Sequence, residues 1–373
     1  MTPQPPPLHI AVDGRYIRAN FHDGISRFSA NLIAELARLV SHRDDVRLTV
    51  LVCNDEQRQR IPFSGPLETF HISPPTSIRE PIVAVQVNRL HADVVFSPMQ
   101  TMGSMGRRYR LVLTIHDLIY YRHPTPPREF NVALRALWRL YHLSWWPQKL
   151  LLRGADAVVA VSQTTRELIR RHRLTRRPIF VVPNAAERLA PGPVVPLAAR
   201  AKKLVYMGSF MPYKNVPTLL NAMTLLPNWE LHLMSRVSTH EIARLCALAP
   251  HAKLIFHNGC TDTEYGDALT SATALVSASR DEGFGIPLVE AMALGTPIVV
   301  SDIPIFREIG GVAALYASPN SPEEFAARIR ELEVPAEWAE RSSAALIQAQ
   351  EFSWSRSAEK LLDVLCDVGR TKP

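Results

Sequence analysis

The chain has 373 residues, which is the length of about two ordinary domains. Hydrophobic residues make up 47% and charged residues 21%, a balance that excludes wholesale disorder, collagen-like repeats and a polytopic membrane protein. The four cysteines are far apart, without CxxC or Cys/His spacing, which argues against a disulfide framework or structural zinc. With no signal-peptide pattern and no run of 18 apolar residues, we expect a cytoplasmic protein.

The net charge of +7 is unevenly distributed along the chain. Residues 1–200 contain 27 Lys and Arg against 15 Asp and Glu, whereas residues 201–373 contain 15 against 20. Most of the excess falls in residues 101–200, with 17 basic and 5 acidic side chains. This asymmetry indicates that the basic half faces an anionic surface or substrate. The alternative is a solvated, arginine-rich surface.

The first half alternates short apolar runs with helical patterns, which is typical of a parallel sheet covered by helices. Apolar residues recur every three or four positions from Ile25 to Leu39, so a helix is predicted over 25–40. Residues 128–156 are expected to form one further helix. The predicted strands are 8–12, 48–53, 94–97, 111–115, 157–161 and 179–182.

A proline-rich segment without periodicity follows Asn184, and the alternating pattern then restarts. The second half predicts strands at 203–208, 229–235, 254–259, 273–279 and 297–302, with helices at 215–223 and 287–295. We therefore predict an α/β protein with two doubly wound, Rossmann-like domains. The expected divisions are an N-terminal domain 1–186, a linker 187–200, a C-terminal domain 201–350 and a crossing helix 351–373.

The most informative stretch runs from Ser279 to Pro304 and reads SRDEGFGIPLVEAMALGTPIVVSDIP. Glu282 and Glu290 are eight residues apart, separated by a Gly-Phe-Gly turn and a helix start at Pro287. Turn glycines allow close approach of the backbone to a ligand, and N–H groups at a helix start favour an anion such as a diphosphate. The alternative is a helix start stabilised by nearby carboxylates.

The string EGFGIPLVE resembles the paired-glutamate motif of the retaining family 4 glycosyltransferases, which have the GT-B fold. The resemblance implies that Glu282 contacts the donor sugar and that Glu290 binds the nucleotide ribose. It also implies that the backbone around Gly283, Phe284 and Gly285 lies along the sugar and the phosphates.

Other stretches resemble landmarks of the same family in the expected order. LVYMGSFMPYKN is similar to its strand and loop for the donor diphosphate, which implies donor-binding roles for Gly208, Ser209 and Lys214. Ser209 stands where the family usually has an arginine. VVPNAAE resembles the last strand of the first domain, and Phe352–Trp354 resembles the start of the crossing helix.

Two further resemblances lie in the first half. HDGISRF is similar to the family's glycine loop and implies that Gly24 lies near the donor and Arg27 near the acceptor or a phosphate, although Ser26 replaces the second glycine. VLTIHDL resembles a strand and loop ending in His-Asp, which implies a catalytic role for His116 and an acceptor- or phosphate-loop role for Asp117.

The segment 128–177 combines arginines with tryptophans, the composition of a helix that binds a membrane interface. The alternative is a helix packed on the sheet with solvated arginines. No nucleic-acid-binding motif accompanies the basic residues, so no nucleic-acid partner is expected. The candidate membrane-contact residues are Arg135, Trp138, Arg139, Trp145, Trp146, Arg170, Arg171, Arg173, Arg176 and Arg177.

The resemblance implies two domains facing a central cleft and a retaining, front-face transfer of a hexose from a nucleotide diphosphate sugar. GDP-mannose is the favoured donor, and a glycan or lipid-linked acceptor in envelope polysaccharide or glycolipid synthesis is expected. No metal and no cofactor are expected besides the donor itself. Two alternatives stay open: a sugar-nucleotide epimerase of the same fold, and a non-catalytic nucleotide-sugar sensor or scaffold.

Overall fold

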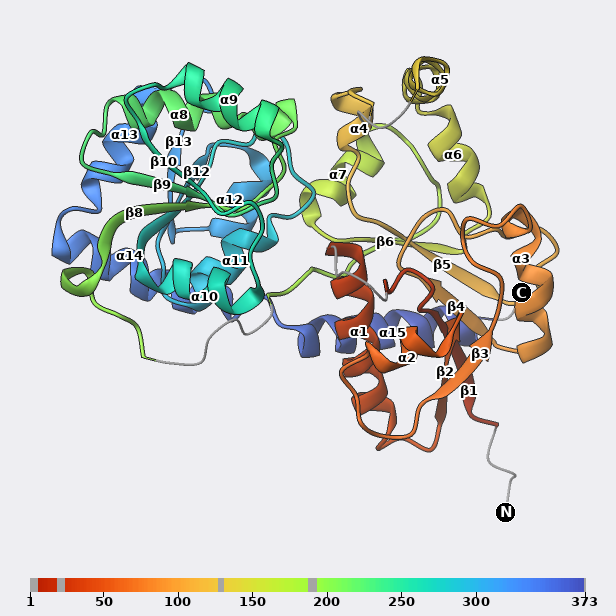
Figure 1. Ribbon diagram of the computed structural model, residues 1–373. Coiled ribbons are helices and arrows are strands. Elements are labelled where there is room, and N and C mark those ends of the chain that lie inside the picture. The colour runs from red at the N-terminus through yellow and green to blue at the C-terminus, as the bar shows by residue number, and fades with distance from the viewer. Residues whose placement is uncertain (1–5, 19–23, 127–130, 187–192, 372–373) are drawn as a thin grey trace. The chain divides into compact units, whose positions relative to one another are not determined.

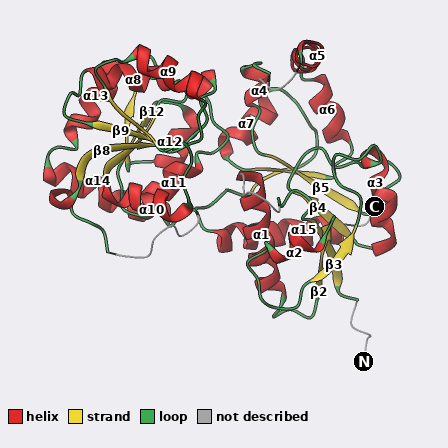
Figure 2. Cartoon of the chain, viewed as in Figure 1, coloured by secondary structure: helices red, strands yellow, loops and turns green. Residues whose placement is uncertain are grey.

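The computed structural model describes residues 6–18, 24–126, 131–186 and 193–371. The chain forms two compact units: unit 1 joins residues 1–184 to residues 354–373, and unit 2 is residues 185–353. Each unit is a parallel sheet with helices packed against it (Figures 1 and 2). The predicted linker spanned 187–200, of which residues 187–192 lie outside the described residues.

The sheet of unit 1 has seven parallel strands in the order β3-β2-β1-β4-β5-β6-β7. Its central strands are buried along their whole length because helices cover both faces, which is why they read as continuous apolar runs. The strands are β1 (Leu8–Asp13), β2 (Val46–Val52), β3 (Glu68–His71), β4 (Val94–Ser97), β5 (Arg110–Ile115), β6 (Ala157–Ala160) and β7 (Ile179–Val181).

The last helix of the chain belongs to unit 1, where it packs beside the first helix and against β1 (Figure 1). Ser357 Oγ donates a hydrogen bond of 2.7 Å to the Pro183 carbonyl oxygen, and the Trp354 ring meets Phe28 edge-on at 5.9 Å. The helices of unit 1 are α1 (Gly24–Val40), α2 (Asp55–Gln59), α3 (Val83–Val87), α4 (Ile119–Arg122), α5 (Val132–His142), α6 (Trp146–Arg153), α7 (Gln163–Arg171) and α15 (Trp354–Arg370).

The sheet of unit 2 has six parallel strands in the order β10-β9-β8-β11-β12-β13. The strands are β8 (Ala201–Tyr206), β9 (Glu230–Leu233), β10 (Lys253–Phe256), β11 (Ala272–Ser277), β12 (Ile298–Ser301) and β13 (Ala314–Ala317). The helices of this unit are α8 (Val216–Thr224), α9 (Thr239–Leu248), α10 (Asp262–Ser271), α11 (Ile286–Ala293), α12 (Pro304–Gly310), α13 (Pro322–Glu331) and α14 (Pro335–Ala349).

Both sheets have a topological switch point, which lies between β1 and β4 in unit 1 and between β8 and β11 in unit 2. Ligands of doubly wound sheets bind outside the carboxyl ends of the strands at such a point. The predicted α/β class with two doubly wound parallel sheets is confirmed, and the switch points show where to look for sites.

Three local predictions were wrong. The single helix over 128–156 is two helices, α5 and α6, because Pro147 lacks the N–H that would continue a helix and instead lies in the first turn of a new one. The edge strands β3 and β13 were not predicted, since β3 is polar and largely exposed and β13 is short and rich in alanine.

Within the described residues, no helix has the length and apolar character needed to cross a bilayer.

Candidate functional site

The switch point of unit 2 brings two separate loops together. Gly208 and Ser209 follow β8, and residues 279–285 follow β11 and lead into α11. Because β8 and β11 are paired in parallel, their carboxyl ends lie side by side. The predicted donor-binding residues of unit 2 therefore lie at the edge of the sheet where a ligand is expected, whereas Gly24, which was assigned to the donor as well, belongs to unit 1.

A short ion pair at this edge joins Lys214 to Glu282. Nζ of Lys214 lies 2.5 Å from Oε1 of Glu282, with the two side chains 17% and 12% exposed. Ser279 Oγ donates a second hydrogen bond of 2.9 Å to the same carboxylate oxygen. The carboxylate is thus held by two partners, and the ammonium group is fixed near the start of α11 rather than extended into solvent.

The loop that carries Lys214 is itself anchored. Asn215 adopts a left-handed conformation with φ of 54°, which turns the chain into α8. Its side-chain amide donates hydrogen bonds to the carbonyl oxygens of Ala278 and Pro319, at 3.0 and 2.7 Å. The buried Asn215 therefore ties the lysine loop to the segment preceding Glu282, which sequence reasoning did not foresee.

Gly285 begins α11 with φ of +97°, a conformation that a side chain would strain, and an added Cβ would lie 3.1 Å from the Phe306 ring. Phe284 is 4% exposed and its ring meets Phe352 edge-on at 5.5 Å, so it packs inward. Glu290 lies one turn into the helix and is 5% exposed. The Gly-Phe-Gly turn thus fixes the direction in which the N–H groups of α11 point.

In the loop after β8, the backbone of Ser209 is held by Tyr206. Its carbonyl oxygen accepts a 2.6 Å hydrogen bond from the Tyr206 hydroxyl, and Gly208 N donates to Ser235 Oγ at 3.0 Å. An added Cβ on Gly208 would lie 2.9 Å from that tyrosine oxygen. Burial, followed by the charge of Glu282, raises the pKa of Tyr206 well above its usual value, so the hydroxyl stays a donor.

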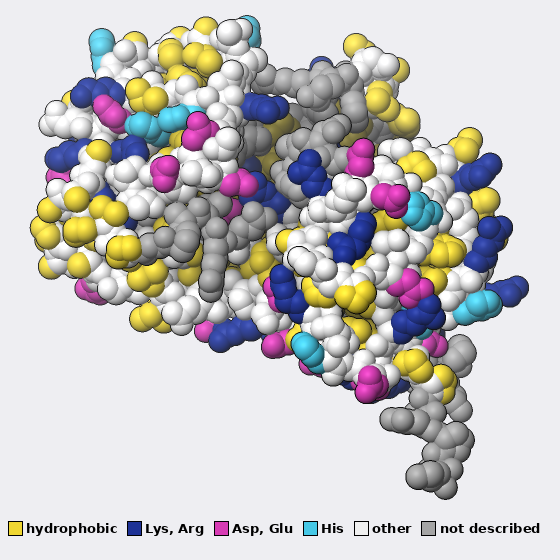
Figure 3. Space-filling view, turned by 60° about the horizontal axis from the view of Figure 1, so that its bottom comes forward, with side chains coloured by type: hydrophobic (Ala, Val, Ile, Leu, Met, Phe, Trp, Pro, Cys, Tyr) yellow, Lys and Arg dark blue, Asp and Glu magenta, His cyan; other side chains and the backbone are white. Residues whose placement is uncertain are grey.

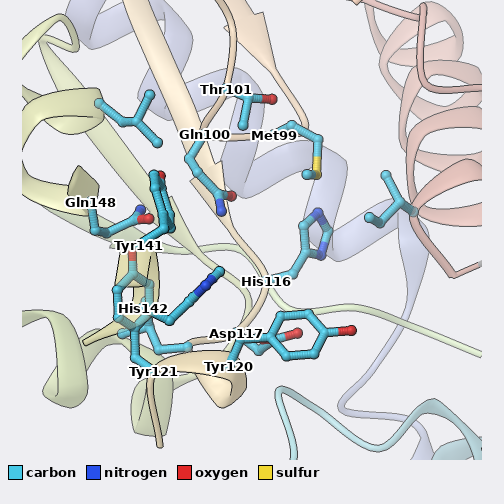
Figure 4. Close-up of a pocket in the computed structure, with 13 residues that line it drawn as sticks. Met99, Gln100, Thr101, His116, Asp117, Tyr120, Tyr121, Tyr141, His142 and Gln148 are labelled. Atoms are coloured by element: carbon cyan, nitrogen blue, oxygen red, sulfur yellow. The ribbon is translucent and has the colours of Figure 1, made fainter. Parts of the chain in front are cut away.

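Unit 1 contains a pocket of about 300 Å³ at the carboxyl ends of β4 and β5. Its wall includes Met99 to Thr101, which follow β4, and His116 to Leu118, which follow β5. Tyr121, Tyr141, His142 and Gln148 form the opposite wall, as Figure 4 shows. A pocket of this volume, with aromatic and polar walls, is suited to a small polar ligand.

The two residues predicted in this region, His116 and Asp117, both line the pocket. His116 Nε2 donates a 2.7 Å hydrogen bond to the Pro98 carbonyl oxygen, which makes Nδ1 the acceptor in the neutral ring. Its ring meets Phe28 edge-on at 4.8 Å. Asp117 Oδ1 accepts a 3.0 Å hydrogen bond from Ile119 N and so fixes the turn into α4.

The aromatic wall was missed by sequence reasoning, although Tyr120 and Tyr121 follow the His-Asp motif after two intervening residues. The rings of Tyr121 and Trp145 stack at 4.5 Å, and His142 lies 4.0 Å from Trp138. His142 Nδ1 donates to the Trp138 carbonyl oxygen, and burial lowers the pKa of this histidine. At neutral pH, His142 therefore presents an uncharged ring.

The predicted glycine loop leads into α1. Gly24 is its first described residue and is exposed, while Arg27 is half-buried in the first turn. Ser26, which stands where the family motif has its second glycine, is fully buried, and its Oγ accepts a 3.0 Å hydrogen bond from Arg18 N. Residues 19–23 of this loop lie outside the described residues.

The candidate membrane-contact residues fall into two groups. Trp145 packs internally, since its ring is stacked between Tyr121 and His172, and Trp138 is half-buried against Tyr120. Trp146 is 61% exposed. Helix α5 buries none of its residues and exposes a series of apolar side chains with Arg139. Arg170, Arg171, Arg173, Arg176 and Arg177 are exposed, and Arg135 is half-buried.

Two family models match the chain, one for each half. Residues 22–187 match "Glycosyltransferase Family 4", and residues 194–345 match "Glycosyl transferases group 1". Together the two models include the pocket of unit 1 and the Lys214–Glu282 pair of unit 2.

The chain is similar to two curated O-antigen enzymes at low identity. It is 26% identical over 226 residues to the O-antigen chain mannosyltransferase RfbU of Salmonella typhimurium, covering 59% of this chain and 60% of that protein. It is 26% identical over 282 residues to O-antigen chain mannosyltransferase B of Escherichia coli, covering 69% and 70%. The chain thus aligns with less than two thirds of the first relative's length.

Solved structures show the fold. The structure of Anabaena Alr3699/HepE in complex with UDP and glucose superposes with a TM-score of 0.68 at 17% identity, covering 96% of this chain and 99% of that one. At this identity the likeness shows the fold, in which each half is a Rossmann-like parallel sheet with helices.

Proposed function

Because this chain belongs to glycosyltransferase family 4, we propose that it transfers a hexose from a nucleoside diphosphate sugar to a hydroxyl group of a glycan or lipid-linked glycan. Mannose from GDP-mannose is the donor we favour, since both relatives described above are O-antigen chain mannosyltransferases. The same relatives support a place in cell-envelope polysaccharide or glycolipid synthesis.

The observation that carries the proposal is the Lys214–Glu282 pair beside the start of α11. A lysine ammonium is a point charge suited to phosphate oxygens, and the N–H groups at a helix start favour the same anion. Glu282 would then hold hydroxyl groups of the donor sugar, and the buried Glu290 would hold the ribose. Support for these roles comes from the contacts that hold Lys214 and Glu282 and from the burial of Glu290.

In the proposed reaction, the bond between the anomeric carbon and the diphosphate oxygen breaks. The acceptor oxygen bonds to that carbon on the same face, and its proton passes to the departing diphosphate, so the anomeric configuration is kept. Lys214 and the α11 N–H groups stabilise the charge of the leaving diphosphate, without a divalent metal or other cofactor. We assign His116 to the donor sugar or a phosphate, and Asp117 and Arg27 to the acceptor or a phosphate.

The pocket of unit 1 is the proposed acceptor site. Its volume of about 300 Å³ suits a sugar residue, and the neutral His142 and the Tyr141 hydroxyl offer hydrogen bonds beside apolar ring faces. Gln148, which is 2% exposed as a residue, adds an amide to the same wall.

We further propose that unit 1 contacts an anionic membrane surface through α5 and α6. Leu137 and Leu140 of α5 are 62% and 65% exposed, and Trp146 of α6 is 61% exposed. The net positive charge of residues 1–200 complements an anionic surface.

The test of the function is thermal stabilisation by GDP, UDP, ADP and CMP, each measured on the protein and on Glu290→Ala. A nucleotide at 100 times its dissociation constant adds about 2.7 kcal/mol of stability. We expect GDP to raise the Tm and Glu290→Ala to lose the shift. No shift with any nucleotide would contradict the proposal.

Turnover then separates the alternatives. A transferase moves labelled mannose to an acceptor, and EDTA leaves its rate unchanged. An epimerase would convert the nucleotide sugar without an acceptor. A sensor or scaffold would bind the nucleotide with neither reaction.

A further inference from the structure

A second pocket of unit 1, of about 650 Å³, has a strongly basic wall. It lies between the last turns of α6 and the segment that follows α7. The other side chains of its wall are Leu152, Leu174 and Thr175, so no carboxylate lines it. Five of its residues are cations: Lys149, Arg153, Arg173, Arg176 and Arg177.

These cations, which we call the basic cluster, have no acidic partner among the residues that the structure describes. No carboxylate of the described chain forms an ion pair with any of the five, whereas Arg107 and Arg110 of the same unit share Asp156 at 2.7 and 3.1 Å. On the face shown in Figure 3, basic and acidic side chains are interspersed. Unneutralised cations that line one concavity concentrate a positive potential there, which attracts a polyvalent anion.

The neighbouring His172 lies in the same positively charged surroundings. Burial lowers its pKa first, and the positive charges of Arg171, Arg122 and Lys149 lower it further. Its ring is also stacked on Trp145 at 4.0 Å, so it sits in a fixed position beside the pocket.

The backbone holds the basic cluster in place. Arg173 has a φ of +49°, in the position after a helix where glycine is usual, and Leu174 N donates a 3.0 Å hydrogen bond to the Ile169 carbonyl oxygen. The Leu174 side chain is 2% exposed and anchors the turn. Arg177 N donates to Thr175 Oγ1 at 3.0 Å. The segment is therefore ordered before any anion arrives.

The pocket adjoins an apolar surface on the same helix. Trp146, Lys149, Leu150 and Arg153 are spaced three and four residues apart, so they lie along one side of α6. Trp146 and Leu150 are 61% and 49% exposed. A helix face that alternates apolar and basic side chains is typical of residues at a lipid interface, where the stems lie among acyl chains and the charges among headgroups.

We propose that the basic cluster binds the phosphate group of an anionic lipid headgroup while Trp146 and Leu150 contact the adjacent acyl region. This inference deepens the membrane contact proposed above and rests on it. The pocket would give that contact a defined headgroup site in place of a diffuse electrostatic attraction.

The experiment compares two triple variants of the full chain, Arg153→Gln/Arg176→Gln/Arg177→Gln and Arg60→Gln/Arg89→Gln/Arg108→Gln. Both remove three exposed cations from unit 1, and the control arginines form no ion pair in the described structure. Co-sedimentation is measured with vesicles of phosphatidylcholine containing phosphatidylglycerol and with phosphatidylcholine alone, at low salt. The Tm of each variant verifies that it is folded.

We expect the pocket variant to lose about 100-fold in affinity for the anionic vesicles. Each cation near an anionic leaflet contributes about fivefold to the affinity, and the variant removes three of them. The control variant should lose less than about threefold. Equal losses in the two variants, or no loss in either, would overturn the headgroup site.

Inorganic pyrophosphate, titrated by calorimetry without vesicles, separates the two sources of phosphate. If pyrophosphate binding depends on the three pocket arginines while vesicle binding does not, the lipid assignment is overturned. Nucleotide stabilisation of the unmodified protein needs no vesicle and reports on unit 2. Its failure would therefore count against the proposed transferase and not against this pocket.

Discussion

Lys214 and Glu282 are 68 residues apart in the sequence, yet Nζ of the lysine lies 2.5 Å from Oε1 of the glutamate. The resemblance implies separate roles for them, one toward the diphosphate and one toward the sugar. Their pairing means that the cation is positioned and that the carboxylate is charge-balanced before a donor binds. A site whose charges are already oriented needs little reorganisation during the reaction.

Lys214→Ala should therefore lower kcat/KM for the donor by about 100-fold or more, because the variant lacks the positive charge that we propose stabilises the leaving diphosphate. The double variant with Glu282→Ala should lose less than the sum of the two single effects, since the residues act as a pair. Steady-state kinetics at varied donor concentration measure both. Lys202→Ala, which removes an exposed lysine 2.6 Å from Glu333, is the matched control. If the effects of the two single variants on kcat/KM simply added up in the double variant, the two residues would not act as a pair.

His116→Ala should lower kcat by about 100-fold, the range expected when a group at the reacting centre is lost. It also removes the hydrogen bond to the Pro98 carbonyl oxygen, so the Tm should fall by a few degrees. His42→Ala, at an exposed position of the same unit, should change neither quantity. An unchanged kcat for His116→Ala at saturating donor would show that His116 has no catalytic role.

Adjacent tryptophans should respond in opposite ways. Trp145→Ala removes a ring stacked between Tyr121 and His172 and should cost about 2–3 kcal/mol in the free energy of unfolding. Trp146→Ala should change that free energy by less than about 0.5 kcal/mol but weaken binding to anionic vesicles. Chemical denaturation and vesicle sedimentation of both variants are the measurements. The reverse pattern would refute the division between internal and membrane-facing rings.

Asp156 should contribute to the loss of stability in acid. Burial alone would raise its pKa, but the Leu111 N–H and Arg107 outweigh burial and hold the pKa below its usual value. Its contribution is thus present above the unfolded-state pKa of about 3.9 and is lost as the pH falls through the lower folded-state value. Asp156→Asn should cost about 2–3 kcal/mol at pH 7.

The difference in free energy of unfolding between the unmodified protein and Asp156→Asn should shrink below about pH 4, because Asp156 then becomes protonated. Urea unfolding at pH 7, 5, 4 and 3 measures it. Asp55→Asn, whose side chain is 83% exposed, is the control and should shift stability by less than about 0.5 kcal/mol. A gap that stays constant with pH would show that the carboxylate charge is irrelevant.

The strands that the sequence predicted well are those buried on both faces, such as β1 and β4, because burial on two sides requires an uninterrupted apolar run. The edge strand β3 is largely exposed and carries no such run, so its pairing with β2 decides its conformation. The same limit applied to residues 128–156, where composition suggested one helix and Pro147 divides it into two.

The candidate site could be predicted where its residues are contiguous. The Gly-Phe-Gly turn and the start of α11 follow from local conformational preferences, so EGFGIPLVE was readable as a unit. The aromatic wall of the unit 1 pocket was not, because Tyr121, Tyr141 and Gln148 come from three different helices. No local pattern links residues whose proximity depends on how those helices pack.

The sequence by itself determined the doubly wound architecture, through its periodicity, and the glycine turn at the start of α11, through local conformational preference. The string EGFGIPLVE also carried the resemblance to the family. Only the tertiary structure decided that Lys214 pairs with Glu282, that Trp145 packs inward while Trp146 is exposed, and that five cations line one pocket. The physical reason is that parallel crossovers bring the ends of distant strands and helices together, and side-chain pairing there depends on three-dimensional distance rather than on sequence spacing.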